Sequence, residues 1–390
     1  MKLKRIVYLL CALALIFGSW GMYDRLVHGH QNAAYGSYVV WGLWVAMYLF
    51  FAGVAAGSFM ISTLDLLFHV KIFQGTGRLA LWVALVSLGA ALLSIWLDLG
   101  HMLRIWKVYL QGNPGSVMTQ MVWGYTLFGF LLLASLYLST RDPNGRLLRL
   151  LMLLGLPLSL FVSGAVGALL GVEASRMFWH VGLLPVQFPV FSLASGAAAM
   201  LVALGLFGRK DDPHRAEQLT VLSISTVALS VVKLYFLWAD FSQSMYGNVP
   251  QNVEAVRAVL FGPYWWAFWI LQILIGTLIP ILVLAQPKLA RNSEWAGWMG
   301  ALILLGFAVA RANIVFPALT VPELEALTTS FTGPHLSFEY FPSLMEWAIT
   351  LGITGLAILA FLIGNDRFQI QADRLPQRAE RLQLSGKEVA

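Results

Sequence analysis

Hydrophobic residues are concentrated in ten long stretches of this chain, and short polar segments separate them. Each stretch reaches roughly the 20 residues that a helix needs to cross a bilayer. The pattern therefore predicts an all-α integral membrane protein with about ten transmembrane helices. The predicted spans are Ile6–Met22, Tyr38–Thr63, Leu79–Asp98, Gln120–Ser139, Leu147–Val172, Pro185–Phe207, Leu219–Asp240, Phe261–Leu284, Ala296–Phe316 and Ser343–Gly364.

The segments outside the spans are short. The longest are residues 317–342 and 365–390, and neither is long enough to fold around a core of its own. We therefore expect a single membrane domain over residues 1–390. The first span follows a basic N-terminus, as a secretory signal does, but Leu10 is too bulky before Cys11 for a lipoprotein cleavage site. We expect it to remain as a helix.

Composition and charge support the same class. Hydrophobic residues make up 59% of the chain and charged residues 11%, so lipid is its main solvent. The net charge of +6 is explained by basic inner loops, including five basic residues in the tail, and nothing indicates nucleic-acid binding. This bias predicts a multi-pass protein of a bacterial or archaeal cytoplasmic membrane with both termini in the cytoplasm. The outer or intramembrane basic residues are Arg25, Arg104, Lys107, Arg176, Lys233, Arg257 and Arg311.

Charged residues within and beside the spans crowd at one predicted membrane face. A charge in hydrocarbon costs roughly 3 kcal/mol on insertion scales, so such residues usually face a bundle interior, a cavity or a partner charge. The sequence therefore predicts a polar site beneath the outer surface, and only Asp65 lies near an inner helix end. The residues at or near outer ends are Asp98, His101, Arg104, Glu173, Lys233, Asp240, Arg311 and Glu346.

Several cofactor classes lack the residues that would hold them. The chain has no Gly-rich phosphate loop, no dinucleotide fingerprint and no zinc-type Cys/His spacing. Cys11 is the single cysteine, so the chain cannot ligate an iron–sulfur cluster by itself. The seven histidines all lie in predicted loops or just beyond span ends, so no pair at mid-depth could hold a haem. We therefore expect no metal, haem or iron–sulfur cluster in this chain.

The segment from Leu97 to Arg104 carries the sharpest group of polar residues. If the helix continues through it, Asp98 and His101 at i, i+3 share a face, and Arg104 lies one turn further on. A carboxylate beside an imidazole, with a guanidinium near, makes a proton acceptor that works near neutral pH. Quinol oxidation releases two protons with two electrons, so a quinone site needs such a group. The alternative is an interfacial ion pair that anchors the helix end.

Other charged positions also have two interpretations. Lys233 and Asp240 lie on one helical face, which indicates either a proton path or charges that pair with Glu346 or Arg311 on other helices. Arg311 and Asn313, near the outer end of the ninth span, would either orient a quinone carbonyl or cap a helix.

Short motifs at the span ends resemble the NrfD/PsrC family, the quinone-reactive membrane anchors of polysulfide-reductase and hydrogenase-2 type. They occur in order over almost the whole chain. The resembling pieces are Trp41-Gly42-Leu43 with the glycine-rich continuation to Gly57, Leu97 to Arg104 followed by Asn113-Pro114 and Ser116-Val117-Met118, Phe178-Trp179-His180 with Leu183-Leu184-Pro185 and Ser195-Gly196, Arg311-Ala312-Asn313, and Tyr340-Phe341-Pro342-Ser343 with Glu346.

The resemblance implies two four-helix bundles, spans two to five (about 38–172) and six to nine (about 185–316), with one flanking helix on each side. It also implies a quinone pocket in the first bundle, near the face where a ferredoxin-like iron–sulfur subunit docks. Family members carry a carboxylate where Asp98 stands, so Asp98 and His101 take the proton-accepting role by motif match. Many members have Arg-Pro-Glu-Arg where this chain has His-Met-Leu-Arg at 101–104. The candidate quinone-binding residues are Asp98, His101, Arg104, Trp123 and Tyr125.

These patterns together predict a quinone-reactive subunit of a respiratory oxidoreductase complex. It would exchange electrons between menaquinol or ubiquinol and the partner iron–sulfur subunit near the outer membrane face. That subunit would connect it to a catalytic subunit such as a molybdopterin enzyme, a hydrogenase or a multihaem cytochrome. The candidate proton-path residues are Lys233, Asp240, Arg311, Glu346 and Glu173.

Other functions stay open. A secondary transporter or proton-translocating protein would have a polar site between helices, in transporters commonly at the midplane beside broken helices. Pro157 and Pro280 could interrupt spans, but the charges lie near one surface. A structural anchor without a quinone is a further alternative. Gly53 and Gly57 form a small-xxx-small pair, which indicates a close helix contact more than a ligand slot.

Overall fold

The computed structural model describes residues 2–209, 212–324, 326–331 and 333–367. All regular elements in these ranges are helices, and they contain ten candidate membrane spans, which confirms the predicted class and number of spans. The long helices are α1 (Lys2–His28), α2 (Leu43–Leu66), α3 (Gly77–Asp98), α5 (Val117–Arg141), α6 (Arg146–Gly171), α7 (Leu184–Phe207), α8 (Arg215–Gly247), α12 (Ser293–Thr320) and α14 (Leu344–Arg367), and the eighth span is formed by η3 (Ala267–Leu278) with α10 (Ile279–Leu284).

The eighth span is mostly a π-helix, which hydropathy alone does not predict. The Thr277 hydroxyl donates a hydrogen bond over 2.7 Å to the carbonyl oxygen of Gln272, five residues earlier. π-helical turns are rare and often lie at functional sites. The shorter helices in the connections are η1 (Lys71–Phe73), η2 (Met102–Arg104), α4 (Trp106–Leu110), α9 (Pro250–Leu260), α11 (Pro287–Ala290) and α13 (Leu327–Ser330).

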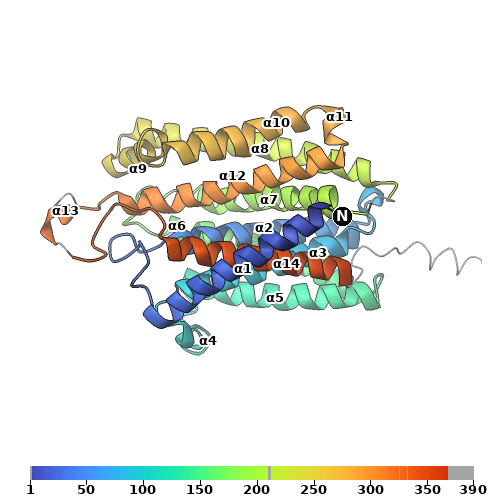
Figure 1. Ribbon diagram of the computed structural model, residues 1–390, viewed down its shortest axis with the longest axis horizontal. Helices are drawn as coiled ribbons and strands as arrows, with labels where there is room; N and C mark the ends of the chain where they lie inside the picture. The colour runs from blue at the N-terminus through green and yellow to red at the C-terminus, as the bar shows by residue number, and fades with distance from the viewer. Residues whose placement is uncertain (1, 210–211, 325, 332, 368–390) are drawn as a thin grey trace, which may run out of the picture.

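Successive membrane helices run in opposite directions, so the connections gather at two ends of the molecule (Figure 1). One end, which we call the Asp98 end, holds the loop 29–42, the segment 99–116 with α4, and α13. The other, the basic end, holds the N-terminus and α11. Two groups of residues predicted to lie on the inner side, Lys210 and the tail after residue 367, fall outside the described residues. Basic residues at this end include Arg78, Arg141, Arg146, Arg149, Arg209, Lys288 and Arg291.

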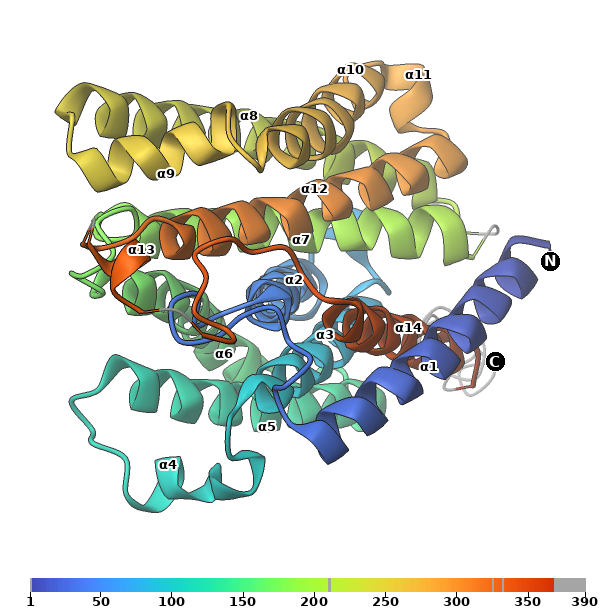
Figure 2. The ribbon, with the colours of Figure 1, turned by 60° about the vertical axis from the view of Figure 1, so that its left-hand side comes forward.

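The helix α2 lies at the centre of the molecule and contacts α3, α6, α7 and α12 (Figure 2). A Cβ atom added to Gly57 would overlap the carbonyl oxygen of Ser192, and one added to Gly196 would overlap the backbone of Gly57. The backbones of α2 and α7 therefore touch, which confirms the close helix contact predicted at Gly57. Because α2 contacts helices of both predicted groups, the division into two four-helix bundles stays a prediction.

The first and last helices lie on the same side of the molecule, so the prediction of one flanking helix on each side is wrong. α1 packs along α14, and α14 packs against α3 (Figure 2). Small residues allow this pairing, because a Cβ atom on Gly18 would overlap the backbone of Gly352, and one on Gly355 would lie 2.8 Å from the Cβ of Ala14. Such small residues let helix backbones approach closely in membranes.

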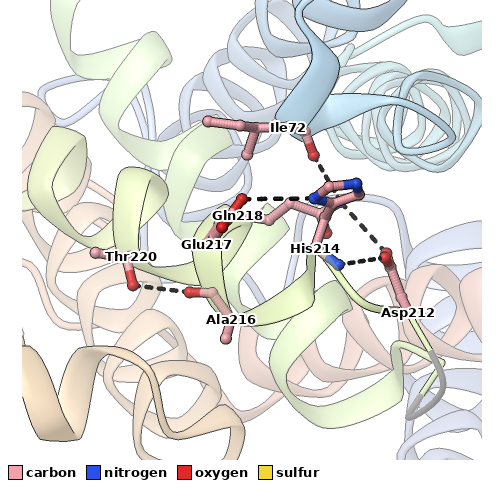
Figure 3. A network of polar contacts seen from close by, with 7 residues as sticks. All are labelled: Ile72, Asp212, His214, Ala216, Glu217, Gln218 and Thr220. Carbon is pink, nitrogen blue, oxygen red and sulfur yellow. Dashed lines mark hydrogen bonds and ion pairs between the residues drawn. The ribbon is translucent and has the colours of Figure 1, made fainter.

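Polar side chains fasten the connections at the basic end. Asp65, at the end of α2, accepts a hydrogen bond from the backbone N–H of Gly77 over 2.9 Å. Figure 3 shows that Gln218, near the start of α8, reaches the neighbouring connection: its amide donates to the carbonyl oxygen of Ile72 over 2.8 Å and to Asp212 over 3.3 Å. These contacts hold the connections of the basic end against the helices.

Candidate functional site

Asp98 is the last residue of α3, and the chain after it is not helical. Leu99 is extended (φ −62°, ψ 129°), and a short 3₁₀ turn begins only at Met102. The expectation that Asp98 and His101 share one helical face is therefore wrong.

Arg25 of α1 binds the end of α3. Its buried guanidinium donates hydrogen bonds to the carbonyl oxygens of Leu97 and Leu99, each over 2.8 Å. The last carbonyls of a helix have no intrahelical partners, and a cation at a helix C-terminus also interacts favourably with the helix dipole. Arg25 thus holds the carbonyl groups of Leu97 and Leu99, the residues before and after Asp98.

The predicted residues His101 and Arg104 lie away from the carboxylate. Both are exposed, and Leu103 between them is 87% exposed. Their segment leads into α4, which stands at the edge of the bundle (Figure 2). The structure therefore does not bring these two side chains to Asp98.

Asp98 instead lines an open cavity of about 570 Å³ at the Asp98 end, which we call the Asp98 cavity. This volume lies within the roughly 300–1,000 Å³ of small-molecule sites. The Oδ1 atom of Asp98 is buried without a hydrogen-bond partner. An unpaired buried acceptor costs about 1–3 kcal/mol, which a ligand hydroxyl could recover. The lining residues are His30, Gln31, Tyr35, Gly36, Ser37, Val40, Asp98, Gly100 and His335.

A chain of polar contacts leads to Asp98 from the loop 29–42. Arg25 Nη2 lies 2.7 Å from His30 Nε2, and His30 Nδ1 lies 2.6 Å from the Tyr35 hydroxyl, which lines the same cavity as Asp98. Burial, reinforced by the charge of Arg25, lowers the pKa of His30. Burial, with the charges of Asp98 and Glu346 adding, holds the pKa of Tyr35 well above its usual range. At neutral pH the imidazole is therefore neutral and the phenol protonated.

Glu346, at the start of α14, fastens the loop 29–42 to the rest of the molecule. Its fully buried carboxylate accepts hydrogen bonds from the backbone N–H groups of Ala34 (3.0 Å), Leu43 (3.2 Å) and Ser343 (2.9 Å), and from the Tyr340 hydroxyl (2.5 Å). Burial, with the charge of Glu346 adding, raises the pKa of Tyr340 well above its usual range. These contacts support a structural role for Glu346 beside the Asp98 cavity.

The aromatic candidates Trp123 and Tyr125 lie on α5, outside the lining of the Asp98 cavity. Tyr125 is buried against Tyr48 of α2, with ring centroids 6.0 Å apart, and donates to the carbonyl oxygen of Val162 over 3.2 Å. Trp123 is half-buried. In the described arrangement Tyr125 is a packing residue between α2, α5 and α6.

A second, smaller cavity of about 40 Å³ lies between α7, α8, η3 and α12, and we call it the Lys233 chamber. Lys233 is 1% exposed; its ammonium donates to Thr277 over 2.6 Å and lies 4.8 Å from the ring centroid of Phe307. Asp240, seven residues further along α8, accepts a hydrogen bond from Gln187 over 3.1 Å. These partners contradict the predicted pairing with Glu346 or Arg311. The polar lining residues are Gln187, Lys233, Asp240, Gln272 and Asn313.

Arg311 and Asn313 lie within α12, seven or more residues before its end at Thr320, so the helix-capping interpretation is wrong. Asn313 donates to Gln272 over 2.7 Å. Arg311 is 2% exposed, its guanidinium lies 3.9 Å from the ring centroid of Phe188, and its Nη1 has no hydrogen-bond partner. Arg311 lines neither cavity.

The remaining candidate, Glu173, follows the end of α6 at Gly171 and is half-buried. It lines neither the Asp98 cavity nor the Lys233 chamber. Within the part of the chain that the structure describes, no group of three or more His, Cys, Asp and Glu side chains is arranged to hold a metal ion.

Sequence reasoning missed Arg25, His30, Tyr35 and His335 as site residues. The sequence carries a signal for two of them: His30 and Tyr35 follow the first span closely, at the predicted outer face where Asp98 also lies. The hydropathy pattern places them in a loop, and only the tertiary fold brings that loop over the end of α3.

Comparison with known proteins identifies the family of the chain. The family model "Polysulphide reductase, NrfD" matches residues 30–323. A selenate reductase subunit of Mesobacillus selenatarsenatis is 30% identical over 93% of both chains. The Hdr-like menaquinol oxidoreductase integral membrane subunit of Archaeoglobus fulgidus is 28% identical, over 87% of this chain and 86% of its own. The menaquinone reductase integral membrane subunit of Nitratidesulfovibrio vulgaris is 23% identical, over 95% and 92%. The chain is a multi-pass integral membrane protein that belongs to the NrfD family of polysulfide reductase membrane subunits.

Proposed function

We propose that this chain is the quinone-reactive membrane subunit of a respiratory reductase complex and that the quinone head group binds in the Asp98 cavity. The observation that carries the proposal is the Asp98 carboxylate, which lines a cavity of ligand size and keeps one buried oxygen without a partner. Two similar proteins are named for menaquinol oxidoreductase and menaquinone reductase, which favours menaquinone over ubiquinone as the substrate.

The residues of the Asp98 cavity fit such a molecule. Val40 offers apolar surface, Gly100 leaves space because it has no side chain, and Tyr35 and Asp98 supply polar atoms beside them. A quinol supplies two electrons and two protons when it is oxidised. Asp98 accepts a proton at a carboxylate oxygen, since a general base must lie within hydrogen-bond reach of the proton that it takes. In the reverse direction the same group returns the proton.

The charge distribution supports an orientation of the complex. Basic residues gather at the end opposite the Asp98 cavity, and loops rich in Lys and Arg stay in the cytoplasm. Both termini then lie in the cytoplasm and the cavity lies near the outer face. We place the electron acceptor, a ferredoxin-like iron–sulfur subunit, at that face, with a molybdopterin enzyme, hydrogenase or multihaem cytochrome beyond it. The similarity to a selenate reductase subunit supports an assembly of this kind.

Asp98→Asn in the intact complex tests the proposal. The amide keeps the size of the side chain but cannot accept a proton, so quinol-linked electron transfer should fall by roughly 10²–10⁴. Activity of the partner with an artificial electron donor should be unchanged, and the matched control Glu339→Gln, an exposed carboxylate, should leave both activities unchanged. Normal quinol turnover in an assembled Asp98→Asn complex would refute the proposal.

The Lys233 chamber favours a second activity, proton translocation through the helices of residues 184–320. A water needs roughly 10–15 Å³ of cavity volume, so the chamber has room for about three waters between its polar side chains. Buried ionisable residues in membrane spans commonly form proton relays. The same volume argues against a secondary transporter, because it is too small for a solute.

A further inference from the structure

The contacts behind Tyr35 determine which atom donates each hydrogen bond. The Arg25 guanidinium has only donors, so His30 Nε2, 2.7 Å from Arg25 Nη2, must act as the acceptor. A neutral imidazole that accepts at Nε2 carries its hydrogen on Nδ1. His30 Nδ1–H therefore donates to the Tyr35 oxygen over 2.6 Å. The Tyr35 hydroxyl hydrogen is then free to point to Asp98, which lines the same cavity.

Arg25 is itself held in place, because it also donates to the carbonyl oxygens of Leu97 and Leu99. The guanidinium thus joins the end of α3 to the imidazole. The direction of the hydrogen bonds from Arg25 to Tyr35 does not depend on an exposed group. A buried Arg is always charged and cannot give up this proton in a protein. The contacts are therefore unsuited to carry protons away past His30, and suited to orient Tyr35.

We propose that Arg25 and His30 are positioning residues of the quinone site: they fix the His30 tautomer and thereby hold the Tyr35 hydroxyl as a donor to Asp98. One carboxylate oxygen is then occupied, and the other is left to accept the quinol proton. In quinol oxidation both quinol O–H bonds break and two electrons pass, one at a time, to one-electron acceptors of the partner iron–sulfur subunit; Asp98 takes one of the two protons, forming a new O–H bond, and the second proton goes to water in the open cavity. This inference rests on the proposed function.

The groups around Asp98 give the inference a measurable consequence. Arg25 from α1, Tyr35 from the loop 29–42 and Glu346 from α14 are charged or titratable groups that face Asp98. His30 touches Tyr35, and His335 lines the cavity from the segment before α14. Without the Tyr35 donor, Asp98 holds a proton more tightly. A smaller fraction of Asp98 is then ionised, and able to accept a proton, at a given pH.

The test is the pH dependence of quinol turnover by the intact complex. With Tyr35→Phe the acid limb of the pH–rate profile should move to higher pH by about one unit, a tenfold change in proton affinity. His30→Gln should produce a shift in the same direction, because Tyr35 loses its fixed orientation. The double variant should shift no further than Tyr35→Phe alone, since both changes remove one interaction. His28→Gln, a partly exposed histidine two residues away, should leave the profile in place.

A lower rate with an unmoved pH profile in both single variants would overturn the inference and leave Asp98 as the base without this positioning. Additive shifts in the double variant would overturn it as well. If His30→Gln does not assemble, Tyr35→Phe alone decides, because it removes one hydroxyl and keeps the ring. Failure of the proposed function is recognised separately, by normal quinol turnover in Asp98→Asn.

Discussion

The backbone N–H of Ala34 donates a hydrogen bond to Glu346 Oε2 over 3.0 Å, joining positions 312 residues apart in the chain. Ala34 belongs to the loop that carries His30 and Tyr35 over the end of α3, and Glu346 lies in the first turn of the last membrane helix, α14. The shape of the Asp98 cavity therefore depends on a contact between the two ends of the sequence.

Replacing Glu346 should destabilise this arrangement. Glu346→Gln puts an amide NH₂ against backbone N–H donors, and hydrogen bonds to charged groups contribute about 1.5–3 kcal/mol each. We expect a loss of about 2 kcal/mol in stability, measured as a lower thermal unfolding temperature of the purified protein. Glu339→Gln, at an exposed position nearby, should have no effect. Equal stability of the two variants would show that Glu346 does not fasten the loop.

The contact between α2 and α7 should not tolerate a side chain at Gly57. Gly57→Ala places a methyl group on the Ser192 carbonyl oxygen, and overpacking costs about 1–3 kcal/mol. The yield of folded protein should fall, whereas the control Gly89→Ala should be neutral because no atom lies within 4 Å of its added Cβ. The prediction fails if Gly57→Ala folds with normal yield and melting temperature.

Hydropathy predicts the membrane helices well because the requirement is local: each span needs its own stretch of apolar residues. The site could be predicted only in part. The position of Asp98 at the end of a span identifies it as a candidate, but the residues that surround it depend on the tertiary fold. α3 ends where Arg25, 73 positions earlier, binds its carbonyl groups, and a helical projection cannot anticipate that contact. A helical projection alone therefore places His101, and not Tyr35, beside Asp98.

The protonation of His30 should make stability depend on pH. Burial and Arg25 lower its pKa in the folded protein below the unfolded value of about 6.5, so folding favours the neutral form. The associated stability is complete above about pH 6.5 and is lost as the pH falls through that value and toward the folded pKa. The melting temperature of the wild type should therefore fall more between pH 7 and pH 5 than that of His30→Gln. Parallel pH curves for the two proteins would contradict this.

Lys233→Met should separate proton translocation from quinol chemistry. The variant keeps most of the side-chain length but removes the buried ammonium of the Lys233 chamber. In proteoliposomes, quinol turnover should stay within about twofold of the wild type, while the number of protons moved per electron decreases. An exposed control, Lys107→Met, should change neither quantity. An unchanged proton-to-electron ratio in Lys233→Met would remove the chamber from the proton path.

The central claim is that the quinone head group binds beside Asp98, and photolabelling tests it most directly. A menaquinone analogue with a photoreactive group on its ring would be bound to the intact complex, irradiated, and its attachment sites mapped by peptide mass spectrometry. We predict labels within residues 30–40 and 98–100, suppressed by excess menaquinone and reduced in Asp98→Asn. Competable labelling confined to α5 around Trp123 and Tyr125, with none in the Asp98 cavity, would contradict the account.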